Sequence, residues 1–281
     1  MIQTATQLKA KVRNKSGGDN TKAQTLIRNS MMERFLERCA LSKYRNHFIL
    51  KGGMFVASYV GLDTRATVDI DTTIQALPMS LELVSEILKE ITDIPLEDGV
   101  SFRITSAKEI MEEQEYPGFR FMMDGFLDRM RQPIKIDIST GDVITPAAIE
   151  YSYPLMFEER SISILAYNPE TVLGEKMETI LSRAEANTRM RDYYDIYVLL
   201  EEKGNDIRED ILRDAFLATC NKRNTSEMIS LAREILVSVK ENDTLRLQWD
   251  NYRRNHYYVG TLEWPEVISG TWKLAELLKI V

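Results

Sequence analysis

The chain has very little of the two residue types on which many catalytic and structural sites depend. Its 281 residues include two cysteines, Cys39 and Cys220, and two histidines, His47 and His256. Two cysteines cannot form a framework of several disulfides, so the sequence fits a reducing compartment. No paired Cys or His spacing of a zinc site is present, and a Ser-His-Asp or Cys-His mechanism would depend on one of the two histidines. Any chemistry must come from carboxylates, lysines and a metal ion.

Long apolar segments are also lacking. The first residues contain no apolar stretch of signal-peptide length, and no run approaches the length of a membrane span. We therefore expect a soluble, cytoplasmic protein that does not enter a membrane. Its length suits one large domain or two small ones, and either can bury a proper core.

Basic residues are outnumbered, since 36 Lys and Arg stand against 43 Asp and Glu, which gives a net charge of −7. This balance argues against a surface adapted as a whole to nucleic acid, although a local basic groove remains compatible with it. Clusters of like charge are usually solvated faces. The local basic clusters are Arg120, Arg129, Arg131 and Lys135, and Arg183, Arg189 and Arg191.

The apolar pattern of the first half of the chain predicts alternating helices and strands. A helical period covers residues 21–42 and 81–91, and strand-like segments occur at 47–50 and 68–74, with a short helix between these two strands. Three alternating strands follow. Their apolar faces are Val100, Phe102 and Ile104; Phe119, Phe121 and Met123; and Ile134, Ile136 and Ile138.

After about residue 155 the pattern becomes helical. The segment 168–170, Asn-Pro-Glu, has the features of a helix start, with a capping Asn, a proline in the first turn and an acid at the positive end of the helix dipole. That helix is predicted to reach about residue 186. Further helices are expected at 191–202, 207–221, 225–239 and 264–279. The fold class is therefore a mixed α/β (α+β) half followed by a helical half.

A glycine pair and two acids make residues 49–73 the most informative segment. Gly52 and Gly53 follow an apolar run and precede the short helix, so they offer close backbone approach and N–H donors for phosphates. Asp69 and Asp71 project from the same side of a predicted strand, where they repel each other unless a cation lies between them. Mg²⁺, held by carboxylates and substrate phosphates, suits such a pair. Taken singly, an Asp-x-Asp pair is commonly a solvated face and a Gly-Gly pair a turn.

A third acid, Asp137, lies on the last of the alternating strands. Lys135, Asp137 and Ser139 share the face opposite the apolar one, so Asp137 points away from the apolar layer. Asp142, in the turn-like sequence Thr-Gly-Asp, is predicted to shape a loop instead.

Two blocks of the sequence resemble motifs of one protein family. Lys-Gly-Gly at 51–53 and Arg-x-Thr-x-Asp-Ile-Asp at 65–71 resemble the first motif of the AbiEii/AbiGii toxin family. Glu-Lys at 175–176, Arg183, and Arg-Asp-Tyr-Tyr-Asp-Ile-Tyr at 191–197 are similar to its lysine motif and its Arg-Asp-x-Tyr-Asp motif. Members are nucleotidyltransferases of the DNA polymerase β superfamily and form the toxin half of bacterial toxin–antitoxin pairs. The resemblance covers residues from about 20 to 200.

This resemblance implies a polymerase β-like nucleotidyltransferase domain at 1–155, a mixed sheet flanked by helices, and a helical domain at 156–281 that contributes to the nucleotide cleft. It implies transfer of a nucleoside monophosphate from an NTP to an acceptor such as RNA or tRNA, and a cognate antitoxin. Asp69, Asp71 and Asp137 would hold two Mg²⁺ (or Mn²⁺) ions, with Asp137 nearer the acceptor and able to act as general base.

The resemblance also assigns nucleotide-binding residues. Lys51, Gly52 and Gly53 would contact the triphosphate, together with Lys176 and Arg183. Considered alone, Lys176 would be expected to be an ordinary surface lysine.

The resemblance further implies that Asp192 is needed for activity, by orienting Lys176 or the base. The alternative is a helix-capping acid paired with Arg189 or Arg191. Tyr193, Tyr194 and Tyr197 are expected to pack in the core.

Two rival interpretations use the same residues. Asp69 to Thr73 also fit the Asp-x-Asp-x-Thr pattern of haloacid-dehalogenase phosphatases, but the preceding residues 65–68 are not the strongly apolar strand that this fold requires. The other rival is a non-catalytic nucleotide-binding or interaction protein with a degenerate transferase fold. The presence of all three acids and both glycines argues against such a loss of the catalytic residues.

Overall fold

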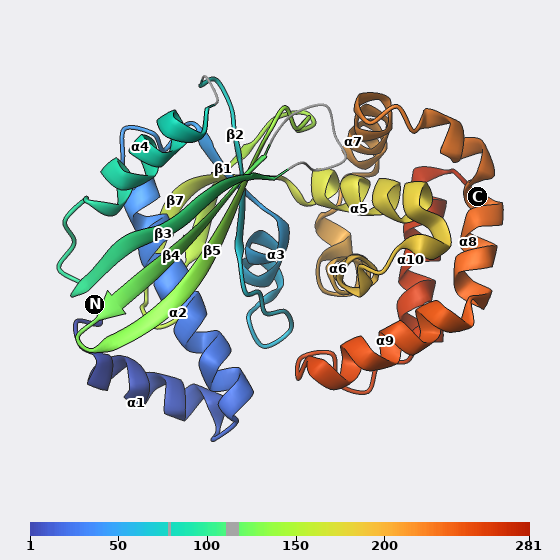
Figure 1. Ribbon diagram of the computed structural model, residues 1–281. Helices are drawn as coiled ribbons and strands as arrows, with labels where there is room; N and C mark the ends of the chain where they lie inside the picture. The colour runs from blue at the N-terminus through green and yellow to red at the C-terminus, as the bar shows by residue number, and fades with distance from the viewer. Residues whose placement is uncertain (78–79, 111–117) are drawn as a thin grey trace. The chain divides into compact units, whose positions relative to one another are not determined.

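The computed structural model describes residues 1–77, 80–110 and 118–281, which form two compact units. Both units are assembled from separate segments of the chain. The first comprises Met1–Ser58, Ala66–Asp142 and Ile149–Ala166, and the second comprises Tyr59–Arg65, Val143–Ala148 and Tyr167–Val281. Figure 1 shows a sheet with helices in the first unit and helices in the second.

A seven-stranded mixed sheet forms the centre of the first unit, in the order β3-β4-β5-β2-β1-β7-β6. Two pairs are parallel, β2 with β5 and β1 with β7, and the other neighbours are antiparallel. The strands are β1 (Phe48–Lys51), β2 (Ile70–Ile74), β3 (Val100–Ile110), β4 (Gly118–Leu127), β5 (Met130–Thr140), β6 (Ile149–Pro154) and β7 (Ser161–Ala166).

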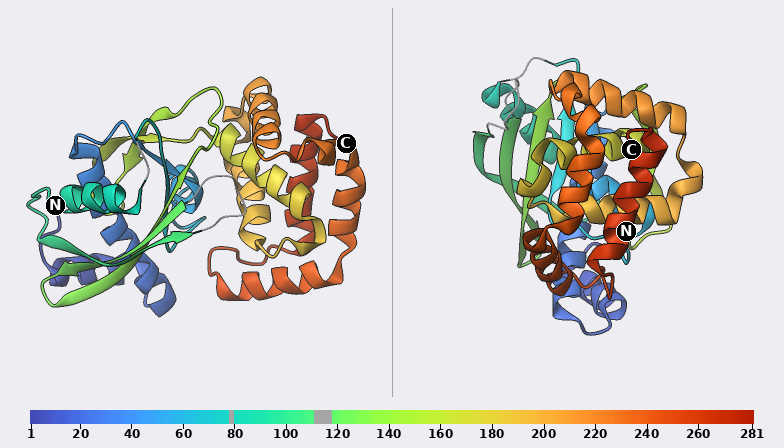
Figure 2. Two further views of the ribbon diagram at one scale, coloured as in Figure 1. Left: turned by 45° about the horizontal axis from the view of Figure 1, so that its top comes forward. Right: turned by 90° about the vertical axis from the view of Figure 1, so that its right-hand side faces the viewer.

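Helices cover one face of this sheet. The helices that begin in the first unit are α1 (Ala5–Ser16), α2 (Asn20–Leu41), α3 (Gly52–Val60) and α4 (Leu81–Thr92). Contacts of α2 with β5 and β7, and of α4 with α2 and β3, put α2 and α4 on the same face, as Figures 1 and 2 show. The opposite face of β3, β4 and β5 is turned to the viewer in Figure 1, with no helix of this unit in front of it.

The core of the first unit lies between these helices and the sheet. On β4 the side chains of Phe119, Phe121 and Met123 are buried, while Arg120 and Met122 point to the other face and remain partly exposed. Antiparallel pairing places Phe121 opposite Ile136 on β5, which is also buried. The period of two in the sequence therefore gives a predominantly apolar face, and its burial packs the sheet against α2 and α4.

The second unit is helical. Its helices are α5 (Pro169–Arg183), α6 (Met190–Lys203), α7 (Glu209–Lys222), α8 (Ala232–Glu241), α9 (Asp243–Asn255) and α10 (Trp264–Leu278), with 3₁₀ turns at Ala184–Ala186, Gly204–Asp206 and Ser226–Leu231. The predicted cap of α5 is confirmed, because the side chain of Asn168 accepts a hydrogen bond from the Thr171 backbone N–H at 2.7 Å. At Gly174, a Cβ would lie 2.9 Å from the backbone nitrogen of Phe216, so α5 and α7 approach closely.

The predicted fold class, a mixed α/β half followed by a helical half, is confirmed. The boundary predicted at residue 155 falls between β6 and β7, whereas the first unit continues to Ala166 because these two strands pair with each other and β7 pairs with β1. The sequence prediction also missed α1, α9 and both of these strands. The strand predicted to start at residue 68 begins at Ile70, so Val68 precedes it and is exposed.

Candidate active site

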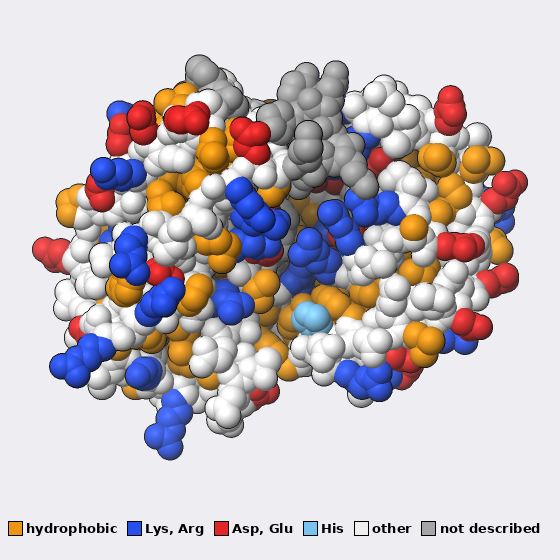
Figure 3. All heavy atoms as spheres, in the orientation of Figure 1, with side chains coloured by type: hydrophobic (Ala, Val, Ile, Leu, Met, Phe, Trp, Pro, Cys, Tyr) orange, Lys and Arg blue, Asp and Glu red, His pale blue; other side chains and the backbone are white. Residues whose placement is uncertain are grey.

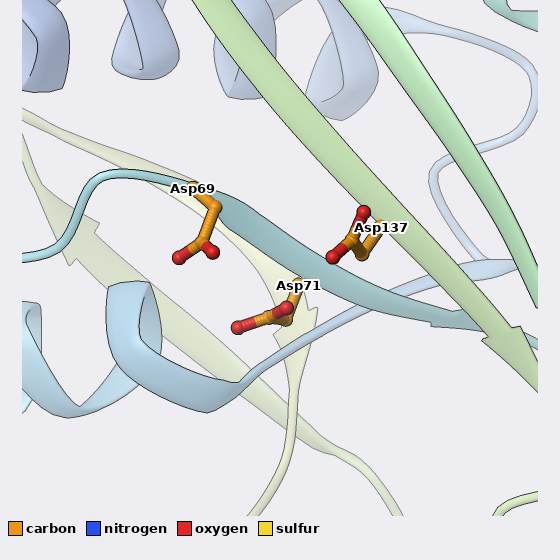
Figure 4. Close-up of side chains that lie close together, drawn as sticks. All are labelled: Asp69, Asp71 and Asp137. Atoms are coloured by element: carbon orange, nitrogen blue, oxygen red, sulfur yellow. The ribbon is translucent and has the colours of Figure 1, made fainter. Parts of the chain in front are cut away.

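Three aspartates predicted to act together do converge in the first unit. Asp71 lies on β2 and Asp137 directly opposite it on β5, because these strands pair in parallel; Asp69 immediately precedes β2. One carboxylate oxygen from each residue can be chosen so that all three lie within 4.8 Å of one another. Figure 4 shows the three carboxylates gathered on one side of the two strands. Hard divalent cations such as Mg²⁺ and Mn²⁺ prefer oxygen ligands of this kind, so these residues fit a metal.

Local structure holds the first acid in place. Asp69 is only 4% exposed, and the Thr67 hydroxyl donates to its Oδ1 at 3.1 Å. Ile70 and Thr72, which alternate with the two acids, are buried on the other side of the strand. Burying a carboxylate costs free energy unless its charge is paired, so the burial of Asp69 indicates that its charge has a specific partner.

Gly52 is required by the close approach of Asp71. It opens α3 with a φ of +63°, and an added Cβ would lie 2.3 Å from Asp71 Oδ2. The backbone N–H groups at the start of α3 therefore lie beside the carboxylate cluster, which suits the predicted contact of Gly52 and Gly53 with phosphates.

We expect Gly52→Ala to weaken metal binding because the new methyl group displaces the Asp71 carboxylate. The affinity for Mn²⁺, measured by titration, should fall at least about tenfold, which corresponds to ~1.4 kcal/mol. Gly17→Ala is the matched control, since Gly17 has a φ of +60° but no atom within 4 Å of the place that its new methyl group would occupy. Both variants carry the same kind of backbone strain, so equal Mn²⁺ affinities would contradict the steric role of Gly52.

Two cations partly offset the negative charge of the cluster. Lys135 Nζ lies 2.7 Å from Asp69 Oδ2 and 3.4 Å from Asp137 Oδ2. Arg120 donates two hydrogen bonds to Asp137, at 2.7 and 2.8 Å. Partial burial acts to lower the pKa of Lys135, but its hydrogen bond to Asp69 and the charges of the acids outweigh this, so the pKa is raised. The pKa of Arg120 is raised as well, chiefly by its hydrogen bonds to Asp137.

Asp142 lies outside this cluster and shapes the adjoining loop. It accepts hydrogen bonds from Lys51 Nζ at 2.7 Å and from the Ser139 hydroxyl at 2.5 Å. Burial acts to raise the pKa of Asp142, but the charge of Lys51 and these hydrogen bonds lower it overall. The predicted contact of Lys51 with a triphosphate stays a prediction.

The second block of the sequence forms a buried ionic network in the second unit, which we call the Asp195 network. Lys176 on α5 contacts Asp192 at 2.9 Å and Asp195 at 2.8 Å, both on α6, and Arg65 contacts Asp195 at 2.6 Å. The Lys176 side chain is only 11% exposed, so it is not an ordinary surface lysine. Burial acts to raise the pKa of Asp195, but Arg65 and Lys176 lower it to about 2. Burial likewise opposes the charge of Lys176, yet its two acids raise its pKa.

Asp192 has structural features of both arrangements considered for it from the sequence, and its role in activity stays a prediction. It lies in the first turn of α6, as a capping acid would, but the partner that holds its Oδ1 is Lys176. Its Oδ2 is buried without a hydrogen-bond partner among the described residues. Arg183 lies in the last turn of α5, where its predicted role toward a nucleotide stays a prediction.

The tyrosines of the block pack as expected. Tyr193 and Tyr194 are buried, and Tyr197 is half-buried. The Tyr194 hydroxyl donates to the backbone oxygen of Thr64 at 2.5 Å. No role was predicted for Arg65 or Asp195, although both belong to the motifs from which the family resemblance was inferred.

A pair of acids at the start of one strand, a third on its parallel neighbour and a glycine-initiated helix beside them suit a phosphoryl-group transferase that uses a divalent cation. The comparison with protein families narrows this class. The family described as nucleotidyl transferase AbiEii toxin, type IV toxin–antitoxin system, matches residues 34–278. The chain therefore belongs to the AbiEii family of nucleotidyltransferases, as its motifs predicted.

Two solved structures from Helicobacter pylori are similar to the chain. A candidate nucleotidyltransferase is 15% identical with a TM-score of 0.49, covering 91% of this chain and 95% of that one. JHP933 is 16% identical with a TM-score of 0.47, covering 91% and 94%. Neither is similar enough for a residue's role to be transferred. The comparison with curated proteins found no match. None of the helices within the described ranges is long and apolar enough to cross a bilayer.

Proposed function

We propose that the protein transfers a nucleoside monophosphate from an NTP to an RNA acceptor, such as a tRNA, in a reaction that depends on Mg²⁺ or Mn²⁺. The observation that supports this most is the convergence of Asp69, Asp71 and Asp137 beside the first turn of α3, in a chain of the AbiEii nucleotidyltransferase family. Metal ions bound there would lower the pKa of the acceptor hydroxyl and neutralise the leaving group.

The residues of the chain would then act as follows. The acceptor oxygen attacks the α-phosphate, the bond from the α-phosphorus to the bridging oxygen breaks, and pyrophosphate leaves with that bond's electron pair. Asp137 accepts the proton of the acceptor hydroxyl, and Asp69 and Asp71 hold the cations. Backbone N–H groups of Gly52 and Gly53 bind the β- and γ-phosphates.

We also propose that Lys176 binds a nucleotide phosphate and that Asp192 and Asp195 fix its position. Lys176→Arg keeps the charge that the two buried acids require but changes the donor geometry. We expect the melting temperature to stay within a few degrees while NTP affinity, measured by titration, falls about tenfold, or ~1.4 kcal/mol. Unchanged NTP affinity with an unchanged melting temperature would exclude Lys176 from nucleotide binding.

Incubation of the purified protein with total RNA and each labelled NTP in turn tests the proposed reaction. We expect label in RNA with one or a few NTPs in the presence of Mg²⁺, and none with EDTA. Label that enters protein instead would overturn the RNA acceptor, and label in neither would overturn the transfer itself.

The family further supports a cognate antitoxin and an action inside the bacterial cytoplasm, where NTPs and RNA are available. Both cysteines are free and buried, which is compatible with a reducing compartment. Expression of the chain in a bacterial host should slow growth, and coexpression of a neighbouring antitoxin gene should restore it. Normal growth at a verified level of active protein would contradict a toxic role.

A further inference from the structure

The face of β3, β4 and β5 opposite α2 and α4, which we call the outer face, carries a marked excess of positive charge. Figure 3 shows Lys and Arg side chains spread over this part of the first unit. The charged residues that alternate with the buried apolar positions are, among those described, Arg103 and Lys108 on β3, Arg120 and Asp124 on β4, and Arg131, Lys135 and Asp137 on β5. The outer face is thus basic in a protein whose net charge is −7.

The cations of the outer face continue directly from the carboxylate cluster. Lys51 lies opposite Asp71, Asp71 opposite Asp137, Asp137 opposite Arg120, and Arg120 opposite Lys108. Residues that lie directly opposite each other in a sheet point to the same side. They therefore form one row across five neighbouring strands, with the acids toward one end and Arg120 and Lys108 beyond them.

The order of the residues in this row assigns the NTP and the acceptor to opposite ends of it. Gly52 and the first turn of α3 lie beside Asp71, at the end of the row that is proposed to take the triphosphate. In phosphoryl transfer the attacking and leaving oxygens lie roughly in line on opposite sides of the phosphorus. The acceptor must then approach from the other end, past Asp137. Strands are about 4.8 Å apart, so Arg120 and Lys108 lie about one and two strand spacings farther along that path.

Farther from the cluster, the outer face offers charge and apolar surface together. The side chains of Arg103 and Arg131 are 65% and 60% exposed and both pair with the buried Asp124. The Arg103 guanidinium lies 5.2 Å from the centroid of the Phe126 ring, which is itself partly exposed, as is Met122. Regularly placed cations beside an aromatic ring are what a single-stranded nucleic acid binds, through its phosphates and its bases.

We infer that the outer face binds the acceptor as a single-stranded segment of RNA, with the phosphates nearest its reacting hydroxyl on Arg120 and Lys108. This inference rests on the proposed function and adds the path of the acceptor. Arg120 uses two of its five N–H donors in hydrogen bonds to Asp137, so it can orient that carboxylate and still bind a phosphate. A nucleic acid presents one phosphate per nucleotide to match the row, whereas most protein segments carry no such regular series of anions.

The test measures binding of a fluorescent single-stranded oligoribonucleotide by anisotropy, without NTP or metal, at several salt concentrations. Lys108→Gln combined with Arg131→Gln removes two cations of the outer face that do not contact the carboxylate cluster. Lys9→Gln combined with Lys89→Gln is the matched control, because these exposed lysines lie on α1 and α4. At low salt we expect the outer-face pair to lose about tenfold in affinity. Its slope of log K against log salt should fall by about 1.4, from two lost phosphate contacts. The control pair should change neither quantity.

Equal losses in both pairs, or no loss in the outer-face pair, would overturn the inference. Measurements of turnover distinguish a failure of this inference from a failure of the proposed reaction. The outer-face pair should raise the KM for RNA while leaving the KM for NTP unchanged. Transfer to RNA with a normal KM in that pair would refute the acceptor path and leave the reaction intact. RNA bound on the outer face without any transfer would refute the reaction and leave the binding surface intact.

Discussion

Asp71→Asn is expected to abolish nucleotidyl transfer while the protein stays folded. The substitution preserves the size of the side chain but removes the charge that faces Asp137 across β2 and β5. Because bound cations supply several kcal/mol of stabilisation to the transition state, the rate should fall about a thousandfold or more. The rate of incorporation of labelled NTP into RNA measures this loss.

Metal binding provides a second measurement on the Asp71→Asn variant. Metal that binds the native state raises its melting temperature, so the rise with Mn²⁺ that we expect for the wild type should be lost in Asp71→Asn. Asp93→Asn is the control, since Asp93 is an exposed acid after α4 and outside the cluster. Full activity in Asp71→Asn would refute the metal-dependent mechanism, and equal loss in both variants would show that overall charge is responsible.

The faces on which the three acids lie could be predicted from a local rule. Alternation separates Asp137 from its apolar neighbours on β5, and the same spacing of two places Asp69, just before β2, on the side of Asp71. Their convergence depends in addition on the parallel pairing of β2 with β5. The partners of these acids could not be predicted in this way. Arg120 meets Asp137 only because β4 pairs with β5 in one register, and a shift of one residue would turn Arg120 to the other face.

The Asp195 network shows the same limit in the helical half. A lysine on a helix is exposed in most proteins, so the residue type argues against burial of Lys176 even though Val172 and Ile180, four residues away on either side, lie on the buried stripe of α5. Its burial depends on two acids contributed by α6 and on Arg65, which precedes β2 in the sequence. The contact of Arg65 with Asp195 joins residues 130 positions apart, and the contacts of Lys176 join two successive helices, so all of them follow from packing and not from local pattern. The short strands β6 and β7 were missed for a related reason, since their place depends on pairing with β1.

Asp195→Asn is expected to destabilise the second unit strongly, because it leaves Arg65 and Lys176 buried with one acid in place of two. Breaking a buried ionic network by removing one partner typically costs about 3–5 kcal/mol. Urea denaturation at neutral pH, followed by tryptophan fluorescence, measures this change. All three tryptophans lie in the second unit, at Trp249, Trp264 and Trp272. Asp210→Asn is the control, since Asp210 forms an exposed ion pair with Arg208.

The dependence on pH identifies the charge of Asp195 as the cause. Its pKa of about 2 in the folded protein lies below the ordinary value of 3.8, so its ionised form stabilises the fold. That contribution is complete above the ordinary pKa and is lost as the pH falls toward 2. The wild type should therefore lose stability between about pH 4 and pH 2 more steeply than Asp195→Asn, whose amide does not titrate there. Parallel curves for the two proteins in this range, or a neutral-pH loss no larger than that of Asp210→Asn, would show that the ionised carboxylate of Asp195 does not hold the network together.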